Sequence, residues 1–414
     1  MKLKDIVTFV SKSVVPQRGA KYNLYSLPSF DENKSAEVLD GAEIQSNKYD
    51  VPNKCILFNK LNVRFKRVWR INNSDSNKIA STEFLPLVVN EDVVDYQYCY
   101  YLLISDEITN YLCGQNSNTS GSHKRIDPQN FLNIDIHLPK MPIQKAIGKT
   151  LSNIDRKIEL NKRINDNLEA MAKQLYDYWF VQFDFPNEEG KPYKSSGRAM
   201  VWNEKLKREI PVGWSVKNLG QIATSYQQGL IRSNNQLSTD SKYGYLKMGD
   251  LDSKGQYTLQ GLTRTNATNE EVDLYSLHKG DFLINVRNSK EIVGKTCLIG
   301  YVERNTLYNH MLVRLDFKDV STFYMNLLFN SEFMYKALDG LKQGTTTVIA
   351  LYQSDLYRLP ILIPAPYVME QFSKITDSIL DQKEIISHEI AELTKQRDEL
   401  LPLLMNGQAV VNSD

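Results

Sequence analysis

The strongest constraint on the fold is a heptad pattern of apolar residues that occurs twice, with an offset of 225 residues. A seven-residue spacing keeps side chains on one face of a helix, and such a seam must face a second helix. We therefore expect two long helices, over 143–185 and 367–401, that pack against each other, with Pro402 ending the second. The first seam comprises Ile147, Ile154, Asn161, Leu168 and Leu175, with Leu151, Ile158, Asn165 and Ala172 beside it. The second comprises Phe372, Ile379, Ile386, Leu393 and Leu400.

Two asparagines, Asn161 and Asn165, place amides where apolar side chains would stabilise the seam more. They either fix the register of the two helices or lie at a solvated edge. Gly148 is the only helix breaker between Ile143 and Phe185. The residues that we expect at the helix seam or at contacts with other subunits are Ile154, Ile158, Asn161, Asn165, Leu168, Leu175, Ile379, Ile386, Leu393 and Leu400.

The segments that precede the two long helices follow the same order, which indicates a duplicated unit. Short apolar runs typical of strands, such as 55–58 and 84–89, lead to a buried helix over 96–104, then a polar loop. A second apolar helix, 323–329, and a second polar loop follow at the same offset. The predicted organisation is a domain at 1–142, a central helix at 143–185, a linker at 186–213, a second domain at 214–366 and a C-terminal helix at 367–406.

Composition indicates a globular cytoplasmic protein. The 50 basic and 49 acidic residues nearly balance, so net charge argues neither for nor against nucleic acid. Four cysteines and five histidines lack the spacing of metal ligands or of a disulfide framework. No apolar run is long enough to span a bilayer, so no membrane partner is expected. The tail 367–414 carries 4 basic and 9 acidic residues, either as a solvated face or as a docking surface for another protein.

The search for catalytic motifs indicates a chain without its own chemistry. The Gly-Lys-Thr triplets at 148–150 and 294–296 lack the upstream glycine of a phosphate-binding loop. No GxGxxG sequence follows a strand, and the Asn/Asp-Pro-Pro-aromatic loop of an adenine methyltransferase is absent. We therefore expect no catalytic residue, no metal and no bound cofactor in this chain.

Candidate DNA contacts lie in two kinds of segment. Residues 60–70 (KLNVRFKRVWR) interleave basic and aromatic side chains, as in a strand that contacts phosphates, although an ordinary amphipathic hairpin is an equal alternative. Residues 285–290 carry Arg and Asn, which suit base edges, and the two polar loops offer further donors. The candidates are Arg64, Lys66, Arg67, Arg70, Asn118, Ser120, Lys124, Arg287, Asn288, Lys290, Lys342, Thr345 and Thr346.

Three stretches carry a specific resemblance. They read NLEAMAKQLYDYWFVQFDFP, GKPYKSSGRAMVWNEKLKREIPVGW and TKQRDELLPLLMNGQAVV, and they resemble the conserved regions of the specificity (S) subunit of Type I restriction-modification systems. The resemblance implies an α+β fold with two mixed α/β target recognition domains, separated by two long antiparallel coiled-coil helices and related by a pseudo-two-fold axis.

The same resemblance implies a non-catalytic chain that binds double-stranded DNA through a split, asymmetric target. It implies two methyltransferase subunits, which bind S-adenosylmethionine and methylate adenine N6, and restriction subunits, which use ATP and Mg. The alternatives are a two-domain DNA-binding regulator that acts without methyltransferases, and an enzyme that acts alone.

Overall fold

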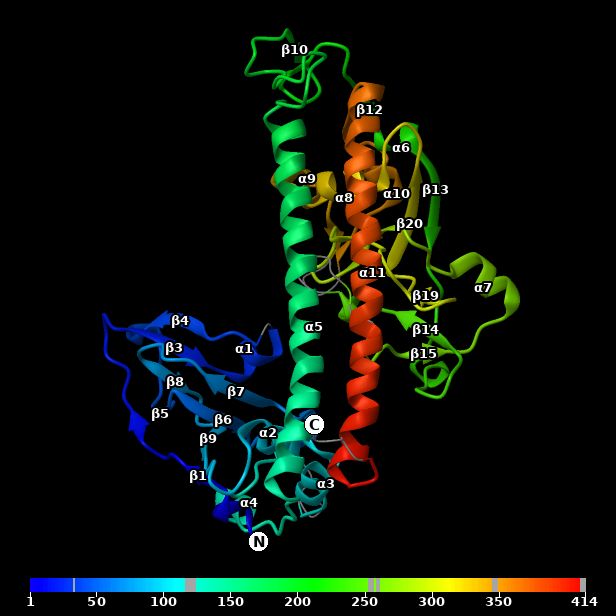
Figure 1. Ribbon diagram of the computed structural model, residues 1–414. Coiled ribbons are helices and arrows are strands. Elements are labelled where there is room, and N and C mark those ends of the chain that lie inside the picture. The colour runs from blue at the N-terminus through cyan, green and yellow to red at the C-terminus, as the bar shows by residue number, and fades with distance from the viewer. Residues whose placement is uncertain (33, 116–123, 252–256, 258–260, 345–348, 410–414) are drawn as a thin grey trace. The chain divides into compact units, whose positions relative to one another are not determined.

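The computed structural model describes residues 1–32, 34–115, 124–251, 257, 261–344 and 349–409 (Figure 1). The chain forms two compact units, Met1–Lys157 with Leu393–Asp414, and Ile158–Glu392. Two long helices, α5 (Met141–Tyr176) and α11 (Pro366–Met405), contribute to both.

The first unit is built on a four-stranded antiparallel sheet in the order β1-β9-β6-β7, with a five-stranded sheet, β2-β5-β8-β3-β4, beside it. Helices α2 and α3 bury their apolar side chains against the four-stranded sheet, together with Leu151 of α5. The strands are β1 (Val7–Phe9), β2 (Ser13–Val14), β3 (Lys21–Tyr25), β4 (Glu37–Asp40), β5 (Lys48–Asp50), β6 (Lys54–Asn59), β7 (Val68–Asn72), β8 (Lys78–Ala80) and β9 (Phe84–Val89). The shorter helices are α1 (Leu27–Glu32), α2 (Tyr96–Ile104), α3 (Asp106–Gln115) and α4 (Pro128–Leu132), with 3-10 turns η1 (Leu3–Asp5), η2 (Gly41–Glu43) and η3 (Val63–Phe65).

The second unit has its own four-stranded antiparallel sheet, in the order β13-β20-β16-β18, and three smaller sheets that carry its loops, β12-β23, β15-β14-β19 and β17-β22-β21. The strands are β10 (Met200–Asn203), β11 (Arg208–Pro211), β12 (Ser215–Asn218), β13 (Ala223–Gln228), β14 (Tyr243–Leu246), β15 (Arg264–Thr265), β16 (Phe282–Asn285), β17 (Arg287–Asn288), β18 (Thr296–Leu298), β19 (Leu307–Tyr308), β20 (Leu312–Phe317), β21 (Gln343–Gly344), β22 (Ile349–Ala350) and β23 (Pro360–Ile363). The shorter helices are α6 (Leu219–Ile222), α7 (Asn269–Tyr275), α8 (Thr322–Phe329), α9 (Glu332–Asp339) and α10 (Gln353–Leu356), with a π-helical turn η4 (Asp177–Val181) and 3-10 turns η5 (Asn234–Gln236) and η6 (Met248–Asp250).

The two four-stranded sheets have the same strand order, and each is followed along the chain by two helices, then a short helix, then a long helix. Helices α2 and α8 begin at equivalent caps, where the carboxylate of Asp95 and the hydroxyl of Ser321 accept the backbone N–H three residues on. The predicted duplication and the α+β class are therefore confirmed.

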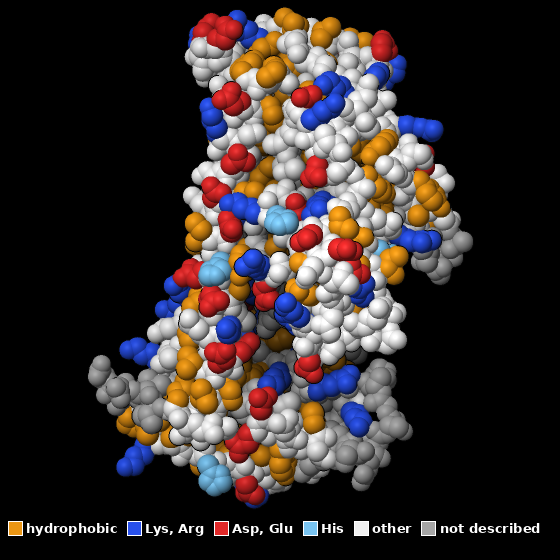
Figure 2. Space-filling view, turned by 90° about the vertical axis from the view of Figure 1, so that its right-hand side faces the viewer, with side chains coloured by type: hydrophobic (Ala, Val, Ile, Leu, Met, Phe, Trp, Pro, Cys, Tyr) orange, Lys and Arg blue, Asp and Glu red, His pale blue; other side chains and the backbone are white. Residues whose placement is uncertain are grey.

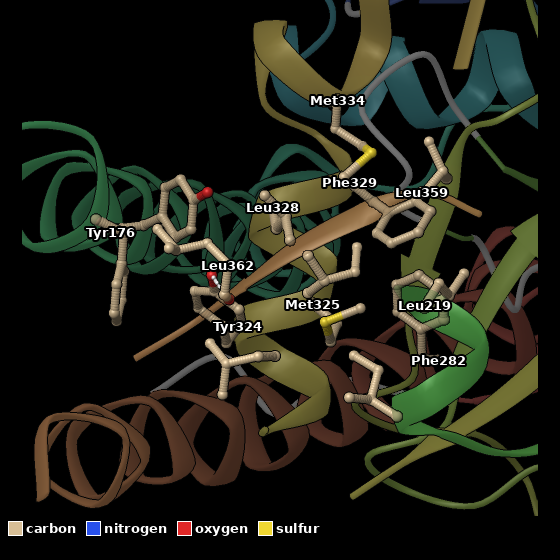
Figure 3. Packing of buried hydrophobic residues seen from close by; sticks show 14 of the residues in the cluster. Tyr176, Leu219, Phe282, Tyr324, Met325, Leu328, Phe329, Met334, Leu359 and Leu362 are labelled. Carbon is tan, nitrogen blue, oxygen red and sulfur yellow. Dashed lines mark hydrogen bonds between the residues drawn. The ribbon is translucent and has the colours of Figure 1, made fainter. Parts of the chain in front are cut away.

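Helix α5 contributes its last residue, Tyr176, to the core of the second unit (Figure 3). Tyr176 from α5 lies beside Tyr324 of α8, whose hydroxyl donates to the carbonyl of Leu362 in β23 at 2.8 Å. Phe282 of β16 and Phe329 of α8 pack edge to face at 5.4 Å between ring centroids. Because a buried phenol needs a hydrogen-bond partner, the bond from Tyr324 to Leu362 fixes α8 on β23.

The ends of the long helices differ from the prediction. Helix α5 ends at Tyr176 and continues only as the turn η4, so the predicted end at Phe185 is wrong. Phe183 has a positive φ of 65°, which no α-helix accommodates. Pro402 was expected to end the second helix, but it lies inside α11. Proline lacks an N–H donor and crowds the preceding turn, but the carbonyl of Pro402 still accepts the N–H of Asn406 at 3.0 Å, so the chain completes another turn.

The segment 186–213, predicted as a linker, contains a β-hairpin made of β10 and β11. Phe185 stacks on Trp214 at 5.1 Å between ring centroids, and Ile210 is buried in the same core. Aromatic packing therefore holds both ends of this segment on the second unit.

Candidate nucleic-acid interface

The turn between β6 and β7 carries the basic residues predicted to contact DNA in the first unit. The strand considered for 60–70 is wrong for its first half, because Val63–Phe65 forms a 3-10 turn. Asn62 and Lys66, which flank it, are both left-handed, with φ of 51° and 47°. Buried Val63 anchors the turn, while Arg64 and Phe65 are exposed. The sharp reversal therefore presents a cation and an aromatic ring to solvent.

Ion pairs hold the sides of this turn. Lys66 pairs with Asp106 of α3 at 2.6 Å, and Arg67 pairs through two nitrogens with Asp31 at 2.6 and 2.7 Å. The guanidinium carbons of Arg64 and Arg67 lie 4.7 and 4.8 Å from the centroid of the Phe65 ring. Two cations thus flank one exposed aromatic ring, within range of cation–π attraction.

The end of the first polar loop meets the same turn. The backbone N–H of Asn62 donates to the carbonyl of Lys124 at 2.9 Å, and Leu61 forms a β-bridge with Arg125. Arg125 in turn makes a bidentate pair with Glu83. Lys124 therefore lies beside the basic turn, while the predicted contacts Asn118 and Ser120 fall outside the described residues.

The second unit brings together the equivalent two segments. Strand β17, which consists of Arg287 and Asn288, pairs with β22, and β22 pairs with β21. The Lys342 ammonium donates to the carbonyl of Lys290 at 2.9 Å and pairs with Asp339 at 3.2 Å. The Lys342 side chain is 4% exposed and bonds to both segments, whereas the side chains of Arg287 and Lys290 face solvent. The predicted contacts Thr345 and Thr346 lie outside the described residues.

One arrangement thus recurs in both units. The connection that leaves the inner strand, β6 or β16, meets the polar loop that follows the second helix, α3 or α9. The sequence suggested each segment separately, but only the fold pairs them. Two further residues beside these segments, Phe65 and His310, were not among the predicted contacts. His310 lies close to Arg287, and its pKa is lowered, first by burial and then by the charge of that arginine.

Arg70, another predicted DNA contact, lies instead in a cluster inside the first unit. Its guanidinium donates to Gln97 at 2.7 Å and to the Asp155 carboxylate of α5 at 3.3 Å, and it lies 4.2 Å from the centroid of the Tyr100 ring. The same carboxylate accepts the Tyr101 hydroxyl at 2.5 Å. These partners fix β7 and α2 on helix α5.

Arg397 of α11 also donates to the Asp155 carboxylate, at 3.3 Å. Burial and the Asp155 charge raise the pKa of the Tyr101 phenol, so this group stays a proton donor. Asp155 therefore joins the four-stranded sheet of the first unit to both long helices.

The seam residues lie along α5 and α11, which are antiparallel: as residue numbers rise along α5, the numbers of their partners on α11 fall. In the second unit, Asn161 donates to the Glu389 carboxylate at 2.8 Å, Asn165 donates to the Ser387 hydroxyl at 3.3 Å, and Glu169 pairs with Lys383. Ala172 is also buried at the seam, in a cluster with Phe323 of α8. Buried seam positions are Ile158, Leu168 and Ile379, and half-buried ones are Ile154, Leu175, Ile386, Leu393 and Leu400.

Basic and acidic side chains are interspersed on the face that Figure 2 shows, so charge alone marks no binding surface there. Among the described residues, no group of three or more His, Cys, Asp or Glu side chains is placed to hold a metal ion. None of the helices in the described part of the chain combines the length and the apolar character needed to cross a membrane.

Comparison with known proteins gives a consistent result. The family model of the Type I restriction modification DNA specificity domain matches residues 1–170 and 211–395. The chain is 23% identical to the Type I restriction enzyme HindI specificity subunit of Haemophilus influenzae, over 88% of this chain and 90% of that protein. It is 25% identical to the MjaIX specificity subunit of Methanocaldococcus jannaschii, over 80% and 73%. The crystal structure of an S subunit from M. genitalium has the same fold, with a TM-score of 0.53, 13% identity and coverage of 98% and 95%.

Proposed function

The chain belongs to the family of Type I restriction-modification specificity subunits, and we propose that it reads a bipartite, asymmetric DNA target and scaffolds the catalytic subunits. Members of this family recognise the DNA target and are non-catalytic, because methylation and cleavage are carried out by partner subunits. The proposal adds which segments of this chain read each half of the target.

The observation that carries the proposal is the recurring pair of segments in the two units. In the first, Arg64 and Lys124 lie on the two connections that meet. In the second, Arg287 and Lys290 lie on the connection that leaves β16, and this connection meets β22 and Lys342 of the polar loop. Arginine and asparagine can bond base edges bidentately, and lysine suits phosphates. The two sets of side chains differ, so each unit would read a different half-site, which explains an asymmetric target.

The long helices suit the role of a spacer. Helix α5 has 36 residues, and α11 has 40. At about 1.5 Å per residue, α5 is roughly 54 Å long, more than one turn of DNA at ~34 Å. Inserting one heptad into α5 should therefore lengthen the unread gap between half-sites or abolish binding, and an unchanged gap with full activity would refute the spacer role.

The proposed partners are two methyltransferase subunits, with S-adenosylmethionine, and restriction subunits, with ATP and Mg, in the cytoplasm. The segment 367–414, with its excess of acidic residues, is the proposed docking surface for one of these proteins. Co-purification with methyltransferase subunits would support this, whereas DNA binding by a chain that never associates with them would favour the two-domain regulator.

A domain exchange tests recognition directly. Residues 1–142 are replaced by the equivalent segment of another specificity subunit, and methylated adenines are mapped across the genome in cells with each version. We expect one half of the methylated motif to change while the other half and the gap stay the same. A motif that changes in both halves, or in neither, would contradict the proposal. The reciprocal exchange of 214–366 serves as the matched control.

A further inference from the structure

We propose that Phe65 is a wedge that partly unstacks a base step in the half-site read by the first unit. This inference rests on the proposed function, and it adds an element that distorts the DNA. It begins from an exposed ring: Phe65 is 52% exposed, at the end of the turn η3. A single exposed apolar side chain is common on protein surfaces. Phe65 differs in being held on a sharp turn with two arginines beside its ring.

The backbone holds the ring in place. Asn62 and Lys66 are non-glycine residues in the left-handed region, one on each side of η3, a conformation that costs free energy and persists only where the surroundings enforce it. Those surroundings are buried Val63, the Asn62–Lys124 backbone hydrogen bond and the Lys66–Asp106 ion pair. The ring is therefore presented on a rigid support.

The charges around the ring specify which apolar partner fits. The guanidinium carbons of Arg64 and Arg67 lie 4.7 and 4.8 Å from the ring centroid, and the backbone of Lys124 bonds to Asn62 on the neighbouring connection. An apolar protein surface would desolvate these cations at a cost. A DNA duplex places phosphates on both sides of its stacked bases, so Arg64 can contact a phosphate while the ring enters between bases and Arg67 stays paired with Asp31. Insertion of a phenylalanine at a base step is an established way for proteins to kink DNA.

The other exposed phenylalanine supplies a matched comparison. Phe333 on α9 is 45% exposed and also has an arginine, Arg208, over its ring, at 6.0 Å. It lies on a helix, apart from the connections that form the candidate interface of the second unit. Replacing Phe333 removes a similar exposed ring without touching either candidate interface.

The experiment uses the full chain in complex with its methyltransferase subunits, and duplexes that carry the target mapped by the domain exchange. The fluorescent base 2-aminopurine is placed in turn at each position of the first half-site, except at the methylated adenine, which the methyltransferase extrudes. Affinity for target and for non-target duplex is measured for wild type, Phe65→Ala, Phe65→Trp and Phe333→Ala.

We expect a fluorescence rise at one step of the first half-site for wild type, Phe65→Trp and Phe333→Ala. With Phe65→Ala the rise disappears, and target affinity falls about tenfold, the loss typical of one stacked base, while non-target affinity changes little. Target affinity unchanged in Phe65→Ala overturns the inference. Weaker binding without any fluorescence rise in wild type also overturns it, because the ring would then contact DNA without unstacking. The proposed function survives either result, since it depends on the domain exchange.

Discussion

The carboxylate of Asp155 holds the four-stranded sheet of the first unit to the long helices, and its removal should destabilise the first unit but not the second. Its side chain is 16% exposed, and it receives Tyr101, Arg70 and Arg397. In Asp155→Ala, two guanidinium groups and a phenol lose their common acceptor at a largely buried site. Removing one member of a buried ion pair typically costs about 3–5 kcal/mol. Because the two arginines are 27% and 24% exposed, we expect the low end of that range, about 3 kcal/mol.

The loss should be visible in amide hydrogen exchange, which resolves different parts of one chain. Peptides from α2, which carries Tyr101, should exchange roughly 100-fold faster in Asp155→Ala, the factor that corresponds to about 3 kcal/mol. Peptides from α8, the equivalent helix of the second unit, should keep their wild-type rates.

Glu159→Ala provides the matched control on the same helix. Glu159 pairs with Arg163 at 3.3 Å, but both side chains are more than half exposed, so the change should cost less than about 0.5 kcal/mol. If amide exchange in α2 is as slow in Asp155→Ala as in Glu159→Ala, the Asp155 carboxylate does not hold the first unit together.

Three further predictions concern the helices and one surface ion pair. Gly148→Ala should destabilise the protein despite the helix propensity of alanine, because the new Cβ would lie 2.7–2.9 Å from atoms of α2 and of its N-cap residue Asp95. Ser373→Ala, at the equivalent position of α11, should be neutral or stabilising, and equal melting temperatures would refute the close approach. Asn165→Leu should stabilise the seam by about 1 kcal/mol, because the buried Oδ1 of Asn165 has no hydrogen-bond partner among the described residues. Thermal unfolding measures this, and a lower melting temperature would show that Oδ1 does have a partner. The hydrogen bond from Arg232 lowers the pKa of Glu271. The pair therefore contributes its full stability at pH values above the pKa of Glu in the unfolded chain, and this stability is lost as the pH falls through the lower pKa of the folded state. Glu271→Gln should therefore be less stable than wild type in denaturant at pH 7 and equally stable near pH 3, and a difference that persists at low pH would contradict this.

The sequence alone determined the features that repeat along the chain. Seven-residue spacing predicted α5 and α11, because a helix places every seventh residue on nearly the same face. The 225-residue offset predicted the duplication, and the stretches around 167–214 carried the resemblance to the family that the family model also matches. Gly148 was visible as a helix breaker, but its reason, the close passage of α2, was not.

Only the tertiary structure decided how distant segments meet. Arg64 and Arg70 lie six residues apart in one basic segment, yet one side chain is exposed and the other bonds to Asp155, 85 residues later. Local composition is the same for both, so nothing near them in the sequence separates a candidate DNA contact from an internal anchor. Asn62 with Lys124, and Arg287 with Ala350, likewise pair through backbone hydrogen bonds, which carry no side-chain signature. Periodic, local features can be read from sequence, whereas the interface depends on long-range pairing that only the folded chain fixes.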